Sequence, residues 1–316
     1  MTFALFIAAA ALSAGLTWSS MPLAHAWGVL DQPGALKIHA SPTPRIGGLG
    51  FVVTALVLGG ALGVLQPYAL AGLLAMAATG LADDRFDLRP RVKLAGQCAA
   101  GALLAADLAS SGAPAWLALC GGALAVVLAN AINLLDGMDG LAAGCSLIAA
   151  LGLAFLAREA GQGWSAEALL AGSLLGFLLW NYPRARTFMG DVGSLALGYL
   201  LAHALSHLGR AGAGPLLAGA GTLCIPVFDV GLGILRRLRA RLPVCSGDRD
   251  HFYDQLQRRT GDVRRTLWIS WGAVLATVIF SVAAPGPAAL RLAVLAAACA
   301  LAAAGFGFVR GGTRAE

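Results

Sequence analysis

The chain alternates long apolar runs with short polar segments from one end to the other. A helix that crosses a membrane needs about 20 mostly apolar residues. Runs of that kind predict spans over residues 2–22, 46–64, 66–82, 93–111, 115–135, 141–157, 167–182, 192–208, 213–235, 267–284 and 288–309. We therefore expect an all-α polytopic membrane protein of about eleven transmembrane helices, with residues 1–316 forming a single domain.

The composition supports a membrane setting. Hydrophobic residues make up 58% of the chain and charged residues 12%, whereas soluble domains carry about one-quarter charged residues. The six cysteines show no C-x-x-C spacing, so they indicate neither a zinc site nor a disulfide framework. We interpret them as small packing residues.

The basic residues predict the orientation, because Lys and Arg accumulate in cytoplasmic loops. If the N-terminus is outside, all 22 Lys and Arg residues except Arg158, Arg210 and Arg291 fall on the cytoplasmic side, and so does the C-terminus. The polar loops 31–45, 83–92, 136–140, 183–191 and 236–265 then share the cytoplasmic face.

Residues 1–26 have an alternative interpretation as a cleaved signal peptide. Ala24-His25-Ala26 has the small-x-small form of a cleavage site. However, no Lys or Arg precedes Lys37, so the basic segment that opens a signal peptide is missing. We expect a retained first span.

Carboxylates inside or at the edges of apolar runs mark the candidate site. They are Asp83, Asp84, Asp136, Asp139, Asp191 and Asp229. An ionised side chain at bilayer depth costs several kcal/mol, and the chain has 16 acidic residues in all, so this placement indicates function. The predicted topology puts all but Asp229 at cytoplasmic helix ends, and Asp229 about two turns inside its span. His25, His203 and His207 fall at or near the ends of predicted spans, and we interpret them as interfacial.

The segment from Asn130 to Gly140 is the most informative. Its spacing of three places Asn130, Asn133 and Asp136 along one side of a helix. The glycines that follow Asp136 and Asp139 end the helix and allow backbone to approach a ligand. Such oxygen ligands suit Mg²⁺, which commonly takes one or two carboxylates together with substrate phosphates.

The other cytoplasmic loops complement this segment. Lys37 and Arg45 lie in a loop rich in proline and glycine and suit a phosphorylated substrate. The adjacent side chains of Asp83 and Asp84 point in different directions. One can therefore face a cation or a phosphate while the other pairs with a basic side chain nearby. Asp191 lies between glycines at the start of an apolar run, where helix amides favour phosphate.

The segment from Arg236 to Arg265 carries nine arginines and four aspartates. This charge suits anionic lipid headgroups or a pyrophosphate. Arg249 and His251 stand out from the general arginine excess, and we expect them to contact substrate.

Taken in order, these motifs resemble the polyprenyl-phosphate N-acetylhexosamine-1-phosphate transferases, also classed as glycosyltransferase family 4. That family includes the phospho-muramoyl-pentapeptide transferases and the undecaprenyl-phosphate GlcNAc-1-phosphate transferases. The motifs are Pro-Thr-Pro-Arg-x-Gly-Gly at 42–48, Asp-Asp at 83–84, Asn-x-x-Asn-x-x-Asp-Gly-x-Asp-Gly at 130–140, Phe-Met-Gly-Asp-x-Gly-Ser at 188–194 and Asp-Arg-x-His at 248–251. The resemblance covers nearly the whole chain.

The resemblance implies an activity and residue roles. The family transfers a sugar 1-phosphate from a UDP-sugar to a polyprenyl phosphate, releases UMP and depends on Mg²⁺, with Mn²⁺ as the alternative ion. It implies that Asp191 and Asn133 contact the metal and that Asp83, with Asp84 beside it, is the candidate base or nucleophile. Contacts to nucleotide and substrate are implied for Lys37, Arg45, Asn130, Asp136, Asp139, Arg249 and His251.

We therefore expect a UDP-N-acetylhexosamine:undecaprenyl-phosphate transferase of a bacterial inner membrane that initiates O-antigen, other surface polysaccharide or cell-wall glycan synthesis. Membrane lipids are expected partners, nucleic acid is not, and a homodimer is an open alternative to a monomer. GlcNAc-transferring relatives tend to carry several histidines where this chain reads Asp-Arg-Asp-His, which leaves GlcNAc and deoxy-N-acetylhexosamines both open. The rival function is a cation-coupled transporter, which predicts acids near the middle of the membrane.

Overall fold

The computed structural model describes residues 1–32, 41–239, 241, 251–284 and a few positions between 287 and 295. Its helices are α1 (Thr2–Trp27), α2 (Leu49–Ala61), α3 (Pro67–Phe86), α4 (Pro90–Ser110), α5 (Ala115–Leu135), α6 (Leu141–Glu159), α7 (Ser165–Asn181), α8 (Gly190–Gly209), α9 (Ala213–Thr222), α10 (Cys224–Arg239), α11 (Phe252–Thr260) and α12 (Val263–Ala283). Two short strands, β1 (Leu30–Asp31) and β2 (Thr43–Pro44), pair antiparallel after α1.

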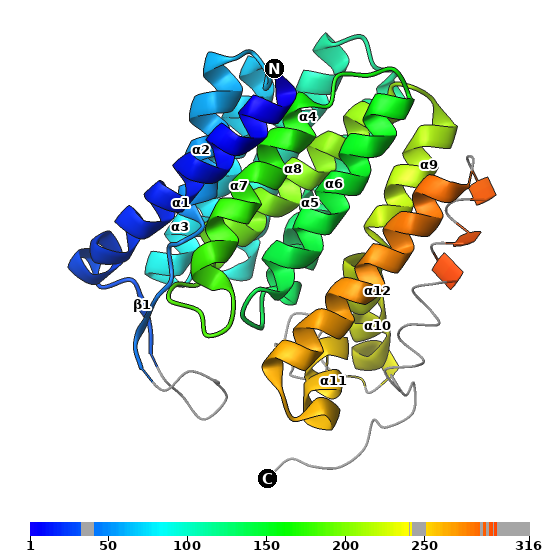
Figure 1. The fold of residues 1–316 in the computed structure, drawn as a ribbon. Helices are drawn as coiled ribbons and strands as arrows, with labels where there is room; N and C mark the ends of the chain where they lie inside the picture. Colours follow the sequence, from blue (N-terminus) through cyan, green and yellow to red (C-terminus); the bar gives the residue numbers. More distant parts are fainter. Residues whose placement is uncertain are drawn as a thin grey trace.

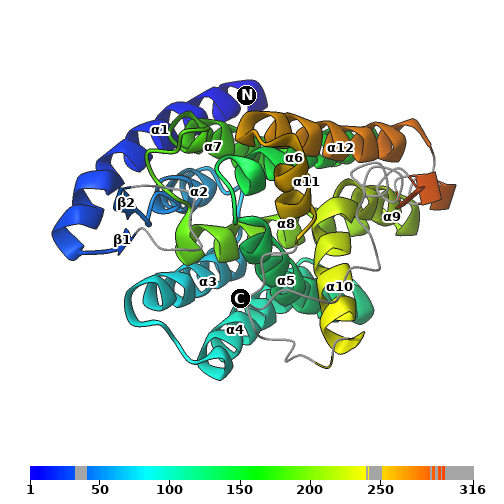
Figure 2. The same cartoon turned by 90° about the horizontal axis from the view of Figure 1, so that it is seen from below.

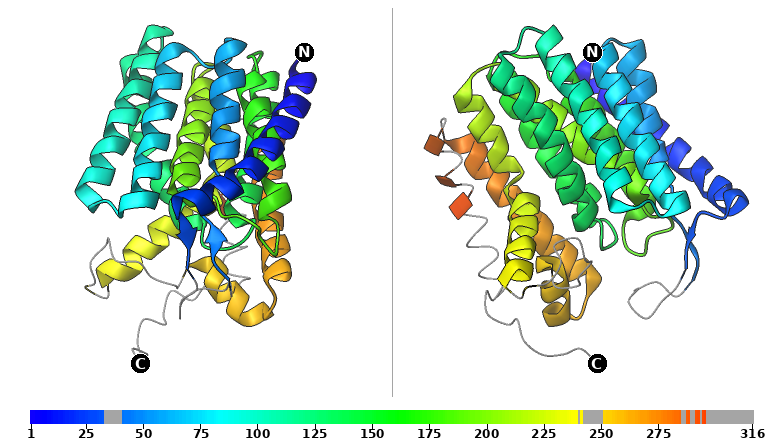
Figure 3. Two further views of the ribbon diagram at one scale, coloured as in Figure 1. Left: turned by 90° about the vertical axis from the view of Figure 1, so that its left-hand side faces the viewer. Right: turned by 180° about the vertical axis from the view of Figure 1, so that it is seen from behind.

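The long helices form a bundle whose connections alternate between its two ends (Figure 1). The N-terminus lies at one end, and the β1–β2 pair, α10 and α11 extend beyond the opposite end (Figure 3). The connections 87–89, 136–140 and 182–189 lie at that same opposite end, which we call the motif end. The bundle therefore brings the sequence motifs of the described residues to one face.

Helix α8 is the centre of the bundle. Seen from the motif end, it lies between α3, α5, α6 and α7 (Figure 2). Nearly every residue of α8 is buried, and small residues allow its neighbours to approach closely. Gly80 of α3 is one such residue, because a Cβ there would collide with the backbone of Asp191 and Val192. The close packing of α3 on α8 fixes the relative position of two candidate site motifs.

The prediction of an all-α polytopic membrane protein is confirmed. Within the described residues, six helices are long and apolar enough to cross a membrane, or seven if α9 and α10 count as one bent span. Large apolar side chains such as Phe3, Trp18, Leu119 and Leu179 are exposed on the outside of the bundle, as expected where lipid is the solvent. The number eleven and the outside position of the N-terminus stay predictions, and most of the predicted span 288–309 lies outside the described residues.

The prediction of one continuous helix over 213–235 is wrong. The chain bends by 70° between α9 and α10, at Leu223. Pro226, in the first turn of α10, has no N–H to donate to the carbonyl of Thr222, so the hydrogen-bond ladder is interrupted there. As a result Asp229 lies on α10 beyond the bend and faces α11.

Helix α1 is built into the bundle. Its Ser13 hydroxyl donates to the Ser173 carbonyl at 2.6 Å, and the Trp180 indole donates to the Ala14 carbonyl at 2.9 Å. These contacts join α1 to α7. Of the six cysteines, the four that the structure describes are free; Cys145 and Cys224 are buried, whereas Cys98 and Cys120 are exposed.

Candidate active site

The first turn of α8 is the point where distant motifs meet. Asp84, at the end of α3, accepts hydrogen bonds from the backbone N–H groups of Asp191 and Val192, each at 2.9 Å. Its side chain is fully buried, and Arg45 Nε lies 3.1 Å from its Oδ1. The carboxylate therefore satisfies amides of a helix start that have no partner within the helix. Asp84 fixes α8 against α3.

Gly190 makes this arrangement sterically possible. It begins α8 with φ at +68°, a left-handed conformation that favours glycine. A Cβ at Gly190 would also collide with the Arg45 carbonyl. The glycine before Asp191 is thus required by both the backbone turn and the close approach of the 42–48 loop.

The Asp191 carboxylate collects partners from separate parts of the chain. Its Oδ1 accepts from Asn133 Nδ2 at 3.0 Å and from Arg45 Nη2 at 3.3 Å. Its Oδ2 accepts from the ammonium of Lys93. Because α8, α5, α4 and the loop after β2 all contribute, Asp191 is the geometric centre of the candidate site.

Asp83 points away from Asp84, as the sequence predicts for adjacent carboxylates at a helix end. Its Oδ1 accepts from the backbone N–H of Leu88 at 2.9 Å, and its Oδ2 lies 2.9 Å from Lys93 Nζ. The Lys93 ammonium thus lies between the carboxylates of Asp83 and Asp191.

Asn133 and Asp136 present acceptors that the described residues leave open. The amide nitrogen of Asn133 donates to Asp191 and, at 2.9 Å, to the Ser194 hydroxyl. No described group donates to Asn133 Oδ1 or to the Asp136 carboxylate. Burial raises the pKa of Asp136 well above its ordinary value, and the negative charges of Asp191 and Asp84 raise it further. This part of the site therefore favours a cation.

Arg45 supplies a fixed positive charge. Burial opposes that charge, but the attraction of Asp84 and Asp191 outweighs burial and raises the pKa of Arg45. Its side chain is still 39% exposed, so the guanidinium can meet a ligand from solvent.

The 136–140 loop is tied to the 182–189 connection. Asp139 Oδ2 accepts from the backbone N–H of Ala185 at 2.9 Å. Buried Asn181 accepts from the N–H of Gly140 at 2.9 Å and donates to the Thr187 carbonyl at 3.0 Å. These bonds hold the loop that carries Asp136 against the segment that leads into Asp191.

Asn130 faces a different neighbour from Asn133. Its amide pairs with the amide of buried Gln97 on α4, through contacts of 2.8 and 3.3 Å. Asp136 follows the last helical residue of α5. The spacing of three therefore distributes these side chains over neighbouring elements, and Asn130 contacts α4 where Asn133 contacts α8.

His251 approaches the site from α11. Its Nδ1 lies 2.7 Å from Asp229 Oδ2, and both side chains are buried. Asp229 Oδ1 also accepts from the N–H of Phe252 at 2.9 Å. The hydroxyl of Tyr253 donates to the Leu134 carbonyl at 3.1 Å, which places α11 beside the end of α5. Asp229, predicted within a span, instead holds His251 in place.

Two predicted site residues, Lys37 and Arg249, lie outside the described residues. Conversely, the sequence reasoning missed Lys93 as a site residue and treated it as one of many cytoplasmic bases. A signal was present, because Lys93 comes ten positions after Asp83 and directly begins an apolar run after Pro90. Gln97 and Asn181 were also missed, and each is a polar residue within an apolar helix.

The side chains around Asp191 fit a magnesium ion by their chemistry. Asp191, Asp83 and Asp136 offer carboxylates, and Asn133 offers an amide oxygen without a donor, the hard oxygen ligands that Mg²⁺ prefers. Lys93 stands between two of these carboxylates in this structure. The site thus offers an ion a few protein ligands and leaves the remainder to water or phosphate.

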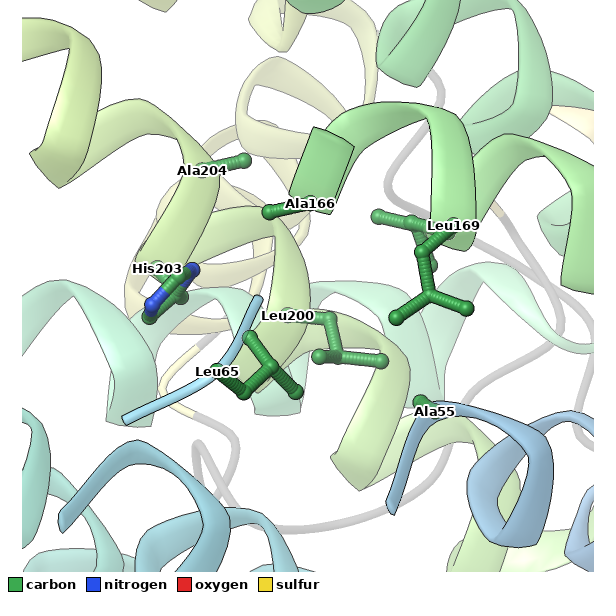
Figure 4. Close-up of a pocket in the computed structure, with 8 residues that line it drawn as sticks. Ala55, Leu65, Ala166, Leu169, Leu200, His203 and Ala204 are labelled. Carbon is green, nitrogen blue, oxygen red and sulfur yellow. The ribbon is translucent and has the colours of Figure 1, made fainter. Parts of the chain in front are cut away.

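Two hollows in the described part of the chain lie away from this cluster. One, of about 10 Å³, is lined by apolar side chains and His203 (Figure 4). Another, of about 340 Å³, lies between the end of α1 and α3 and is lined mainly by apolar residues, with Arg85 as its charged member. The acidic cluster at the motif end is largely buried and lies apart from both of these hollows.

A helical membrane bundle with carboxylates, an amide and bases gathered at one end defines a membrane enzyme acting on charged substrates. Comparison with known proteins assigns the family: the chain belongs to glycosyl transferase family 4, whose profile matches residues 67–208. Membership of a transferase family argues against the transporter alternative.

Named relatives extend over most of the chain. A probable undecaprenyl-phosphate N-acetylglucosaminyl 1-phosphate transferase of Bacillus subtilis is 32% identical, over 72% of this chain and 70% of its own. A decaprenyl-phosphate N-acetylglucosaminephosphotransferase of Mycobacterium leprae is 31% identical, over 82% of this chain and 79% of its own. An undecaprenyl-phosphate alpha-N-acetylglucosaminyl 1-phosphate transferase of Thermotoga maritima is 29% identical, over 80% of this chain and 78% of its own.

Proposed function

We propose that this protein transfers an N-acetylhexosamine 1-phosphate from a UDP-sugar to a polyprenyl phosphate and releases UMP. The observation that carries the proposal is the convergence of Asp83, Asp191 and Asn133 with Arg45 and Lys93 at the first turn of α8. Joining two polyanions requires positive charge at the reacting phosphates. This cluster combines the cationic side chains of Arg45 and Lys93 with oxygen ligands for a metal ion.

In this proposal Arg45 and Lys93 bind and orient the donor pyrophosphate. The Arg45 guanidinium is held by Asp84 and Asp191 and remains partly exposed, so it can present a fork of N–H donors to phosphate oxygens. Asp191 and Asn133 would hold Mg²⁺, with Mn²⁺ as the alternative, and the ion would polarise phosphoryl oxygens. Asp136 and Asp139 would face the nucleotide side of the same pocket.

Asp83 is the candidate base or nucleophile. One of its oxygens is fixed by the backbone N–H of Leu88 and the other by Lys93. This orientation keeps a carboxylate at the edge of the cluster, where it could take the proton of the acceptor phosphate or attack phosphorus. Asp84 is too deeply engaged with α8 to share that role, and we assign it to positioning.

The site requires both a lipid acceptor and a soluble donor. The cluster lies at the end of the long helices, where an isoprenoid tail stays in the bilayer while its phosphate meets a nucleotide. Together with the basic loops, this placement supports a bacterial inner membrane location with the site facing the cytoplasm. The relatives are named for N-acetylglucosamine, which favours that sugar over deoxy-N-acetylhexosamines for initiating a surface polysaccharide or cell-wall glycan.

A transfer assay tests the proposal. Membranes containing the protein are incubated with radiolabelled UDP-GlcNAc, or another UDP-N-acetylhexosamine, and undecaprenyl phosphate. We expect a labelled lipid from at least one donor, strongest with GlcNAc, and its loss on addition of EDTA. If folded protein makes no labelled lipid from any donor, the proposal is wrong.

Asp191→Asn provides the matched variant. The amide removes the charge at the geometric centre and leaves the shape nearly unchanged, so turnover with Mg²⁺ should fall by about 10²-fold or more. A variant that keeps the wild-type rate and metal dependence would contradict the role of Asp191.

A further inference from the structure

A second polar cluster lies at the end of the bundle opposite the motif end. Asp107, near the end of α4, faces His203 and His207, which are one turn apart on α8. Asp107 Oδ2 lies 3.3 Å from His207 Nε2 and 3.8 Å from His203 Nε2. Among the described residues this is the group of three potential metal ligands whose atoms lie within 4.8 Å of one another.

The burial of Asp107 leaves one of its carboxylate oxygens open to a ligand. Its side chain is fully buried, and its Oδ1 has no hydrogen-bond partner. His207 and His203 face Oδ2, but a buried carboxylate oxygen without a partner is unfavourable, and a bound metal ion would relieve it. His203 is also buried, whereas the His207 side chain is 25% exposed, so the cluster is reached from the His207 side.

From this geometry we propose that Asp107, His203 and His207 bind a divalent transition-metal ion of the zinc class, separate from the active site. Zinc ligands at about 2.0–2.1 Å in tetrahedral array lie about 3.3 Å apart. The Asp107–histidine separations of 3.3 and 3.8 Å therefore need only a small contraction. Two imidazoles and a carboxylate supply three ligands, and water can take the fourth position beside His207.

Arg210 is the charged neighbour of His207 whose side chain must move when a metal ion binds. Its Nη1 lies 3.5 Å from Nδ1 of His207, and its Nη2 donates to the Ser111 carbonyl. A histidine that binds metal through Nε2 carries its proton on Nδ1, so Arg210 turns away when the ion binds. Arg210 is exposed, which leaves it free to do so.

The competing explanation is a hydrogen-bonded His–Asp pair that binds no ion, and metal binding by the full-length protein separates the two. The protein is purified in detergent, stripped with EDTA, and titrated with Zn²⁺ by calorimetry and with Co²⁺ by visible absorption. We expect one ion with a tetrahedral Co²⁺ spectrum per chain, beside any ion that the oxygen ligands of the active site hold. His207→Ala and Asp107→Asn should weaken affinity by about tenfold or more.

Two controls locate the ion. His25→Ala removes an exposed histidine of α1, and Asp191→Asn removes the central carboxylate of the active site; both should keep the ion and its Co²⁺ spectrum. Retention of the tetrahedral Co²⁺ spectrum by His207→Ala and Asp107→Asn overturns the proposal, and so does wild-type protein that shows no such spectrum. If a variant elutes as aggregate, the wild-type Co²⁺ spectrum and its persistence in Asp191→Asn decide the question. None of these readouts requires transferase activity.

Discussion

Two neighbouring acidic residues of the candidate site, Asp83 and Asp84, face in different directions and have different partners. Asp83 and Asp84 follow each other in the chain, but Asp83 faces Lys93 while Asp84 is buried under the first turn of α8. A pair of acids in a sequence would suggest a shared chemical role. In the proposed function, these different surroundings give Asp83 the chemical role and Asp84 the positioning role.

Asp84→Asn should destabilise the protein more than it changes substrate chemistry. The amide can replace one acceptor but presents its NH₂ group to a backbone N–H, so a buried donor loses its partner, at a cost of about 1–3 kcal/mol. The thermal midpoint of the purified variant should fall. Exposed Asp87→Asn, three positions away, is the control and should unfold like the wild type; equal midpoints for both variants would contradict the capping role.

Lys93→Ala should change the dependence of the rate on Mg²⁺. The Lys93 ammonium occupies carboxylate oxygens that the proposed ion also uses. Its removal should lower turnover, because Asp83 loses its orienting partner, and lower the Mg²⁺ concentration for half-maximal rate. Rates measured across a Mg²⁺ series check this, and a higher requirement for Mg²⁺ would show that Lys93 does not compete with the ion.

At the scale of elements, most helix positions could be predicted from the sequence because each apolar run is close in length to a helix. The bend between α9 and α10 was missed because length and hydropathy alone do not register Pro226. Helix α11 was missed because it is short and carries only three buried apolar residues, Phe252, Tyr253 and Leu256, among polar ones. The partners of Asn130 and Lys93 could not be predicted, since they depend on which helices pack together.

The contact of α3 with α8 predicts a specific sensitivity to added volume. Gly80→Ala puts a methyl group into the backbone of Asp191 and Val192, and separating the helices should cost about 1–3 kcal/mol. Gly15→Ala is the matched control, because nothing lies near its Cβ and alanine favours a helix by about 0.5–1 kcal/mol. Thermal unfolding should show opposite shifts; a neutral Gly80→Ala would mean that the helices pack less closely.

At the scale of the molecule, the alternating connections give the proposed orientation a direct test. Ser41, after β1, and Gly163, between α6 and α7, are exposed and lie at opposite ends of the bundle. In a background with the native cysteines replaced, a membrane-impermeant maleimide should label Gly163→Cys in intact cells. It should label Ser41→Cys only after permeabilisation, and the reverse pattern would place the active site outside.

The sequence motifs predicted which end of the bundle the candidate residues share, but not how these residues are arranged there. Order along the chain shows that Asp83, Asn133 and Asp191 reach the same end, since each terminates or begins an apolar run. It does not show that they meet at α8, because that follows from the central position of this helix among α3, α5, α6 and α7.

The capping of α8 by Asp84 also bears on how the chain is made. The amides that Asp84 satisfies lie 107 and 108 positions further along, so α3 is synthesised and inserted long before they exist. Until then Arg45, already translated, is the available counter-charge for that carboxylate. A nascent chain that stops short of Asp191 therefore lacks both the packing of α8 on α3 and the candidate active site. We expect both to form when α8 docks against α3.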